Sequence, residues 1–267
     1  MIQRCIVYFV RMFQWRSITI LLLLSISATS FAWGPTGHRA IGHVAEQHLS
    51  KKAQKAIKAI LGNESLAIAS TYMDEVRADR KFDHTHDWHW VTIPDGSTYA
   101  GTEKNPDGDL IEAIERMKIS ITDENSSIEE KRRDLRFLIH LIGDLHQPLH
   151  IGRGDDRGGN EFKVKWMNKS SNLHRVWDSG IIDLQKLSYT ELAESLDPIS
   201  SQQKAEWQQG TTEDWAHEAM QYRDRIYAIE EGDRLGYGYA YEHWPLVREQ
   251  LNKAAIRLAG VLNTLFG

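Results

Sequence analysis

Apolar residues recur every three or four positions through most of the chain, which is the spacing of one face of an α-helix. The first stripe consists of Ile41, Val44, Ala45 and Leu49. The same pattern predicts helices at 36–50, 51–61, 66–78, 110–121, 127–145, 173–184, 211–229 and 241–265. We therefore expect one compact all-α domain.

Local signals set the ends of these helices. Ser127 followed by Glu130 forms a capping-box pattern, and Pro148 follows the predicted end of the same helix. Residues 79–109 are rich in proline and glycine and predict irregular structure. The segment NEFKVKW, residues 160–166, alternates apolar and polar positions and predicts one strand of a small β-hairpin.

The first 32 residues have the pattern of a secretory leader. Three arginines precede the apolar run SITILLLLSISA, which is about a dozen residues and too short to span a bilayer comfortably. Small residues at Ser30 and Ala32 fit a signal-peptidase site. This predicts a cleaved signal peptide at 1–32, a mature domain at 33–267 that begins at Trp33, and a secreted or periplasmic location. The alternative is an uncleaved N-terminal anchor.

Removal of the leader changes the composition. Cys5, the single cysteine, is lost, so disulfides cannot stabilise the mature domain, and bound metal becomes a candidate cross-link. The chain has 32 basic and 37 acidic residues; losing three arginines leaves 29 against 37, a formal charge of −8. Such a chain has no long-range positive field to attract nucleic acid, so any phosphate-binding charge must be local.

The segment HLIGDLHQPLH, residues 140–150, places metal-capable side chains in an apolar helix. His140 and Asp144 are four residues apart and share a helix face. Pro148 ends the helix, so His150 can turn back toward them. Histidine and aspartate without cysteine suit zinc in hydrolytic chemistry. The alternative is a hydrogen-bonded histidine–aspartate pair in the core.

Similar combinations occur elsewhere in the chain. NLHRVWD repeats the four-residue spacing with His174 and Asp178. The remaining candidates are Asp74 and Arg77 in TYMDEVRAD, His89 in WHW, and His38 in WGPTGH. Buried charges of this kind are costly unless they are paired or bind metal.

Together these motifs resemble the zinc-dependent single-strand nucleases of fungi, plants and bacteria. The resemblance rests on WGPTGH, YMDEVR, WHW, HLIGDLHQPLH, GGN and NLHRVWDSGII, which occur in this order from residue 33 to about 182. It implies the helical zinc fold that these nucleases share with zinc-dependent phospholipase C, and a cluster of three Zn²⁺.

The resemblance also implies which residues bind zinc. The implied ligands are Asp74, His89, His140 and Asp144 for one zinc; Trp33, His38 and Asp144 for the second; and His150, His174 and Asp178 for the third. Asp144 would bridge the first two ions. Trp33 would contribute its α-amine and backbone carbonyl.

Further residues carry implied roles in the reaction. Arg77 would contact phosphoryl oxygens in the transition state, and Asp74 would also orient the attacking hydroxide. Trp90 would stack on a base, which favours unpaired strands. Thr92 stands where fungal members have a base-binding aspartate, so base preference is open. Lys163 is a candidate backbone-phosphate contact, with a solvated strand face as the alternative.

The expected function is a trinuclear-zinc endonuclease that cleaves single-stranded DNA and RNA to 5′-phosphorylated products. We also expect 3′-nucleotidase activity, a monomer and no membrane anchor. One alternative is a zinc-dependent phospholipase C, whose last ligand is glutamate where this chain has Asp178. Another is a periplasmic zinc-binding protein without activity, which would not account for Arg77 or Trp90.

Overall fold

The computed structural model describes residues 33–267 of the chain. The predicted signal peptide, Cys5 and the choice between cleavage and anchoring lie outside these residues. Within residues 33–267, no helix is both long enough and apolar enough to cross a membrane.

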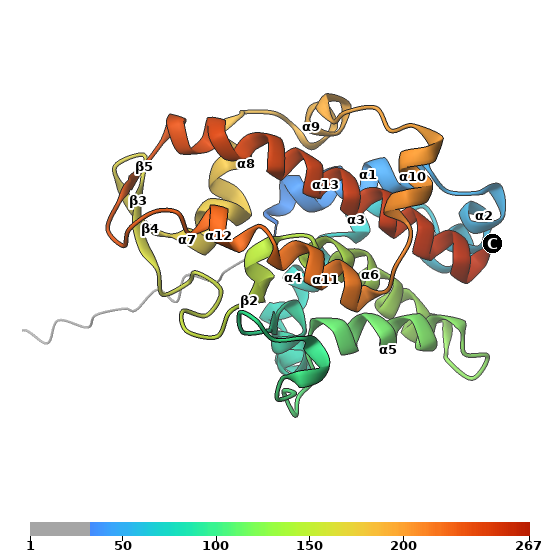
Figure 1. Ribbon diagram of the computed structural model, residues 1–267. Helices are drawn as coiled ribbons and strands as arrows, with labels where there is room; N and C mark the ends of the chain where they lie inside the picture. The colour runs from blue at the N-terminus through green and yellow to red at the C-terminus, as the bar shows by residue number, and fades with distance from the viewer. Residues whose placement is uncertain (1–32) are drawn as a thin grey trace, which may run out of the picture.

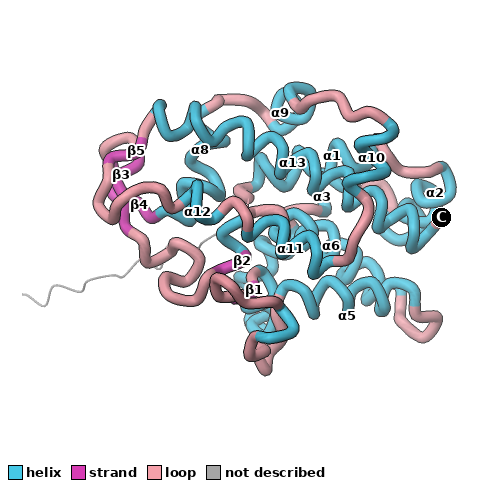
Figure 2. Tube along the Cα trace, in the orientation of Figure 1, coloured by secondary structure: helices cyan, strands magenta, loops and turns pink. Residues whose placement is uncertain are grey.

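Helices make up most of the described chain (Figures 1 and 2). The α-helices are α1 (Pro35–Gln47), α2 (Lys51–Leu61), α3 (Leu66–Ala69), α4 (Tyr72–Glu75), α5 (Leu110–Thr122), α6 (Ile128–Leu145), α7 (Leu173–Arg175), α8 (Ile181–Leu184), α9 (Tyr189–Ser195), α10 (Ser201–Trp207), α11 (Thr212–Met220), α12 (Arg223–Ile226) and α13 (Tyr237–Phe266). Tighter 3₁₀ turns lie at Val76–Ala78, Arg80–His89, Tyr99–Gly101 and Pro148–His150, and a wider π-helical segment at Val176–Gly180.

The strands are short and form two small sheets. In the first, β1 (Val91–Thr92) pairs in parallel with β2 (Ile151–Gly152). In the second, β3 (Lys163–Trp166) pairs antiparallel with β4 (Lys169–Asn172) and parallel with β5 (Arg234–Leu235). The predicted all-α class with a small hairpin is therefore confirmed.

The second half of α6 forms the centre of the molecule. Every residue from Phe137 to Leu145 is buried. Helix α5 packs on one side of α6, and the long helix α13 packs on another while also covering α1 (Figure 1). The buried side chains form one core that extends from Trp33 to Leu262. The metal-capable residues of α6 thus lie deep in the domain, within reach of several elements.

Most predicted helices are present, but the predicted helix at 66–78 is wrong as one continuous element. It is divided into α3, α4 and a 3₁₀ turn. At the division, the hydroxyls of Ser70 and Thr71 donate to the carbonyls of Ala67 and Ile68. Such local hydrogen bonds compete with helix geometry. The break leaves the Ser70 carbonyl available to a side chain of the central cluster, described below.

Two helices were not predicted, although their start signals are present in the sequence. Helix α9 begins with a capping box between Ser188 and Glu191, and α10 begins after the cap Ser200. Helix α13 begins four residues before the predicted start at 241 and continues through the exposed Pro245.

Candidate metal centre

The described residues contain three groups of side chains that could each hold a metal ion. The groups are His38 with His140 and Asp144; Asp74 with His89 and His140; and His150 with His174 and Asp178. Within each group, the candidate ligand atoms lie within 4.8 Å of one another. All of these residues were predicted from the sequence as ligands, and the fold brings them together from five separate segments.

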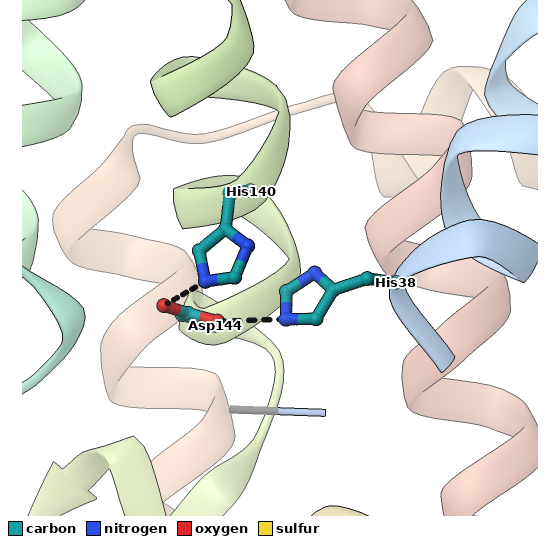
Figure 3. A group of neighbouring side chains, drawn as sticks. All are labelled: His38, His140 and Asp144. Atoms are coloured by element: carbon teal, nitrogen blue, oxygen red, sulfur yellow. Dashed lines mark ion pairs between the residues drawn. The ribbon is translucent and has the colours of Figure 1, made fainter. Parts of the chain in front are cut away.

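Asp144 is the centre of the first two groups. Its Oδ1 lies 3.2 Å from His38 Nε2, and its Oδ2 lies 2.9 Å from His89 Nδ1 and 3.3 Å from His140 Nε2. Figure 3 shows His140 and Asp144 on α6, with His38 approaching from α1. Both oxygens of one carboxylate therefore face different histidines, as a carboxylate that bridges two cations requires.

Asp74 approaches this pair of groups from α4. Its Oδ1 lies 4.0 Å from His140 Nε2. The neighbouring His140 ring stacks on the His38 ring, with 3.9 Å between the ring centroids. Gly143 makes this close approach possible, because a Cβ atom there would lie 2.8 Å from His38 Nδ1. The close packing of α1 on α6 thus depends on a glycine in the central helix.

The third group lies on a short helical turn instead of a long helix. His150 Nε2 is 3.6 Å from Asp178 Oδ1, and His174 Nε2 is 3.3 Å from Asp178 Oδ2. His174 lies on α7 and Asp178 on the π-helical segment that follows, so their four-residue spacing again puts them on one face.

Backbone carbonyls fix the orientation of three histidine rings. Nδ1 of His140 donates to the Ser70 carbonyl at 2.7 Å, and Nδ1 of His150 donates to the His89 carbonyl at 2.6 Å. Nδ1 of His174 donates to the Gly158 carbonyl at 2.6 Å. A carbonyl oxygen only accepts, so the proton lies on Nδ1 and each neutral ring presents a lone pair at Nε2. Metal-binding histidines are held in this way.

These residues fit a bound cation. The buried atoms without a hydrogen-bond partner include both ring nitrogens of His38, Nε2 of His89 and His150, and one oxygen each of Asp74 and Asp144. Buried polar atoms are normally paired, and an unpaired one is destabilising by about 1–3 kcal/mol. Nitrogen and oxygen lone pairs that converge without protons between them match the donor set of Zn²⁺.

The charges of the cluster lead to the same conclusion. Burial tends to lower the pKa of His140, but the Asp144 and Asp74 carboxylates outweigh it and raise the pKa to about 9. Burial and the charge on His140 lower the pKa of His38 to about 4. The histidines hold the pKa of Asp144 well below its usual range despite its burial. The carboxylates therefore require positive charge beside them, which a metal ion supplies when bound.

Trp33 lies next to the third group. Its side chain is fully buried, and the following residue, Gly34, donates its backbone N–H to the Asp178 carbonyl at 2.7 Å. The start of the predicted mature chain is therefore hydrogen-bonded to a segment that carries a candidate ligand.

Gln147 also holds the third group, and the sequence did not reveal this role. Its Nε2 donates to Asp178 Oδ1 at 2.6 Å, while its Oε1 accepts from the backbone N–H of Leu149 at 2.7 Å. The second bond fixes which end of the amide faces Asp178. Gln147 is fully buried and lies between two predicted ligands in the sequence.

The predicted catalytic arginine lies at the edge of the first group. Arg77 Nη1 is 3.6 Å from Asp74 Oδ1, and Nη2 is 3.2 Å from His86 Nδ1. Trp90 is half-buried and meets the edge of His86, with 5.2 Å between ring centroids. Thr92 is exposed on β1. Arg77, His86 and Trp90 thus form a continuous rim.

Lys163 is not part of this rim. It is exposed on β3, and its Nζ donates to the Asn160 carbonyl at 2.7 Å. The structure leaves it on a strand face, which was the alternative interpretation of the alternating lysines.

His146, which was predicted to contact a ligand or line the cleft, instead packs in the core. Its Nδ1 donates to the Ile142 carbonyl at 2.7 Å, and its Nε2 lies 3.1 Å from Arg257 Nη1. Burial and the charge on Arg257 lower its pKa to about 3. His146 is therefore a neutral structural histidine between α6 and α13.

A buried cluster of histidines and aspartates with an adjacent arginine is the arrangement of a metal-dependent hydrolase that acts on phosphate esters. Comparison with known proteins gives the family. Residues 33–267 match the S1/P1 nuclease family, so the chain belongs to that family.

Individual relatives agree over nearly the whole length. The chain is 28% identical to Endonuclease 2 of Arabidopsis thaliana, over 92% of this chain and 94% of that protein. It is 26% identical to Nuclease S1 of Aspergillus oryzae, over 91% and 94%. It is 32% identical to Nuclease P1 of Penicillium citrinum over shorter segments, 55% and 57%. The chain is thus a zinc-dependent nuclease that hydrolyses phosphodiester bonds, which confirms the predicted enzyme class over phospholipase C and zinc storage.

Proposed function

We propose that this nuclease acts on single-stranded DNA and RNA, releases 5′-phosphorylated products and also removes the phosphate of 3′-nucleotides. The observation that carries the proposal is the convergence of three histidine–aspartate groups beside Arg77 and Trp90. The nucleic-acid substrates named here go beyond family membership and rest on the chemistry of this rim.

We further propose that the centre binds three zinc ions. The ligands would be Asp74, His89, His140 and Asp144 for one ion; Trp33, His38 and Asp144 for another; and His150, His174 and Asp178 for the third. When bound, zinc supplies an activated water near neutral pH and positive charge for the phosphate. On an acidic chain, this local charge is what attracts the substrate.

The side chains beside the ligands position the reacting groups. Arg77 would donate to phosphoryl oxygens and stabilise the negative charge that grows in the transition state. Its contacts with Asp74 and His86 hold the guanidinium at the edge of the cluster before substrate arrives. Asp74 has a carboxylate oxygen free of hydrogen bonds there, which suits it to orient the attacking water.

Trp90 supports the preference for single strands. A half-buried indole beside the cluster offers a face for one unpaired base, and such stacking is largely independent of sequence. A paired base remains within its own stack and cannot enter in the same way. Thr92 offers one hydroxyl at the neighbouring position, so we expect weak discrimination between bases.

The ligand role of Trp33 requires cleavage after Ala32, which in turn implies export to the periplasm or the cell exterior. The family match begins at residue 33, which supports this boundary. We propose that the mature enzyme is a soluble monomer.

The test is a substrate panel with the purified mature protein. Zinc content is measured by elemental analysis, and turnover is measured on single-stranded DNA, RNA, 3′-AMP and phosphatidylcholine, each with and without chelator. We expect about three zinc ions per chain and chelator-sensitive cleavage of the first three substrates. A preference for duplex DNA, or products with 3′-phosphates, would contradict the proposal.

A further inference from the structure

The second sheet carries positive charge on one face. In the β3–β4 pairing, Lys163 is opposite Asn172 and Lys165 is opposite Ser170. In the β3–β5 pairing, Lys165 is opposite Arg234. Residues at paired positions share a face of the sheet. We call this set, namely Lys163, Lys165, Ser170, Asn172 and Arg234, the basic sheet face.

The basic sheet face points away from the protein body. Lys163, Lys165 and Arg234 are exposed, whereas the alternate residue Val164 is buried. The other face of the sheet packs against the segment that carries the third metal group: a Cβ atom at Gly180 would lie 3.0 Å from the Trp166 indole nitrogen.

This charge is not balanced within the described part of the chain. Neither Lys165 nor Arg234 forms an ion pair there, and their paired positions place like charges side by side, which is unfavourable. The acidic turn before β5 is partly engaged elsewhere: Asp233 accepts from the Glu230 N–H, and Glu231 accepts from the Lys163 N–H. An unbalanced cationic face on a chain of net charge −5 calls for an anionic partner.

The location of the face connects it to the metal centre. Strand β4 ends at Asn172, which caps α7, and His174 lies two residues further on. The Leu173 N–H also donates to the Phe162 carbonyl beside β3. A polyanion that leaves the third metal group in this direction would therefore run onto the basic sheet face.

We propose that the basic sheet face binds the sugar–phosphate backbone of a single-stranded substrate, beyond the nucleotides that occupy the metal centre. The two lysines are two residues apart on β3, about 7 Å along the strand, so they would contact successive parts of the backbone. The Ser170 hydroxyl and the Asn172 amide add neutral hydrogen-bonding groups. This inference rests on the proposed function and assigns to it a subsite for long substrates only.

The experiment compares a long substrate with a short one. The zinc-loaded mature enzyme and its Lys165→Gln/Arg234→Gln variant are assayed on a single-stranded 20-mer and on a dinucleotide. We expect the KM for the 20-mer to increase about tenfold at low salt, with the dinucleotide kcat/KM unchanged. The slope of log KM against log salt for the 20-mer should fall in magnitude by about 1.4, because two phosphate contacts are lost.

A matched control uses two exposed lysines on α2, at the opposite end of the molecule from β3 and β5 (Figure 1). Lys55→Gln/Lys58→Gln removes the same charge and should leave the 20-mer KM near the wild-type value. The conservative pair Lys165→Arg/Arg234→Lys should also preserve tight binding.

The outcomes separate the inference from the proposed function. If the wild type cleaves neither substrate, the proposed function fails and this inference fails with it. If the wild type cleaves both but the 20-mer KM is the same in the variant, only the inference is overturned. Equal losses on both substrates, or equal losses in the α2 control, also overturn it. Reduced binding to anionic phospholipid vesicles with an unchanged 20-mer KM would indicate a membrane surface instead.

Discussion

The Asp144 group and the Asp178 group use the same spacing of histidine and aspartate but are supported in different ways. His140 and Asp144 lie in the buried half of an 18-residue helix, and its packing holds their positions. His174 and Asp178 span a three-residue helical turn and a π-helical segment. Here the Gly158 carbonyl, the Gln147 amide and the Gly34 N–H supply the support.

The difference indicates how each group should respond to change. The Asp144 carboxylate faces three histidines, so its loss affects two proposed zinc sites at once. The Asp178 group depends on individual hydrogen bonds from loops, so single neighbouring residues should adjust it without damage to the pair. The predictions below test this contrast, from the largest expected effect to the smallest.

Asp144→Asn should have the largest effect. The amide cannot bridge two cations as the carboxylate does, and it would place N–H groups against lone pairs of the histidines. We expect loss of about two zinc ions per chain and a decrease in kcat/KM of more than about a thousandfold. Elemental analysis and single-strand cleavage assays would measure both.

Asp134→Asn provides the matched control for this change. Asp134 is also a buried carboxylate on α6, but it bonds Ser120 and Arg133 outside the centre. Its replacement should lower stability without lowering zinc content. Full zinc occupancy in Asp144→Asn would contradict the bridging role.

Arg77→Ala should reduce turnover by about two to three powers of ten with zinc content unchanged, because the arginine stabilises charge only in the transition state. The measurements are kcat on single-stranded DNA and elemental analysis of the same sample. Arg80→Ala is the control, since this exposed arginine pairs only with Asp83 among the described residues. If Arg77→Ala lost zinc, its role would be structural.

An added residue before Trp33 tests the third support of the Asp144 pair, the proposed N-terminal amine. An extra alanine there should displace the amine, lower zinc content by about one ion and reduce activity about a hundredfold. The same alanine added after Gly267 should have no effect. Full activity and full zinc in the N-terminal variant would remove Trp33 from the ligand set.

The sequence could predict the side chains of the centre because helical spacing places His140 with Asp144 and His174 with Asp178 on shared faces. It could not predict their supports in the same way. The Ser70 and Gly158 carbonyls that orient His140 and His174 are backbone atoms, which every residue has. Only the fold determines which carbonyl meets which ring.

The same limit explains the errors in the fold. The stretch 66–78 has helical apolar spacing, but the hydroxyls of Ser70 and Thr71 satisfy carbonyls of α3 and interrupt it. His146 has the same local sequence context as the candidate ligands His140 and His150. Its ring meets Arg257, more than a hundred residues away, and no local pattern reveals that contact.

Gln147→Leu should have the smallest effect and the most selective one. Leucine removes the hydrogen bond that holds Asp178 Oδ1, while the packed Asp144 pair is untouched. Loss of such a supporting bond lowers metal affinity by about 10- to 100-fold, and we expect this for one zinc only. Stepwise zinc titration against a competing chelator measures each dissociation constant separately. Gln147→Glu should weaken the same zinc, because its carboxylate would face the Asp178 carboxylate. Gln250→Leu, which changes another buried glutamine away from the centre, should alter none of the three constants. A uniform decrease in all three affinities for Gln147→Leu would mean that the two groups share one support, and the contrast between them would not hold.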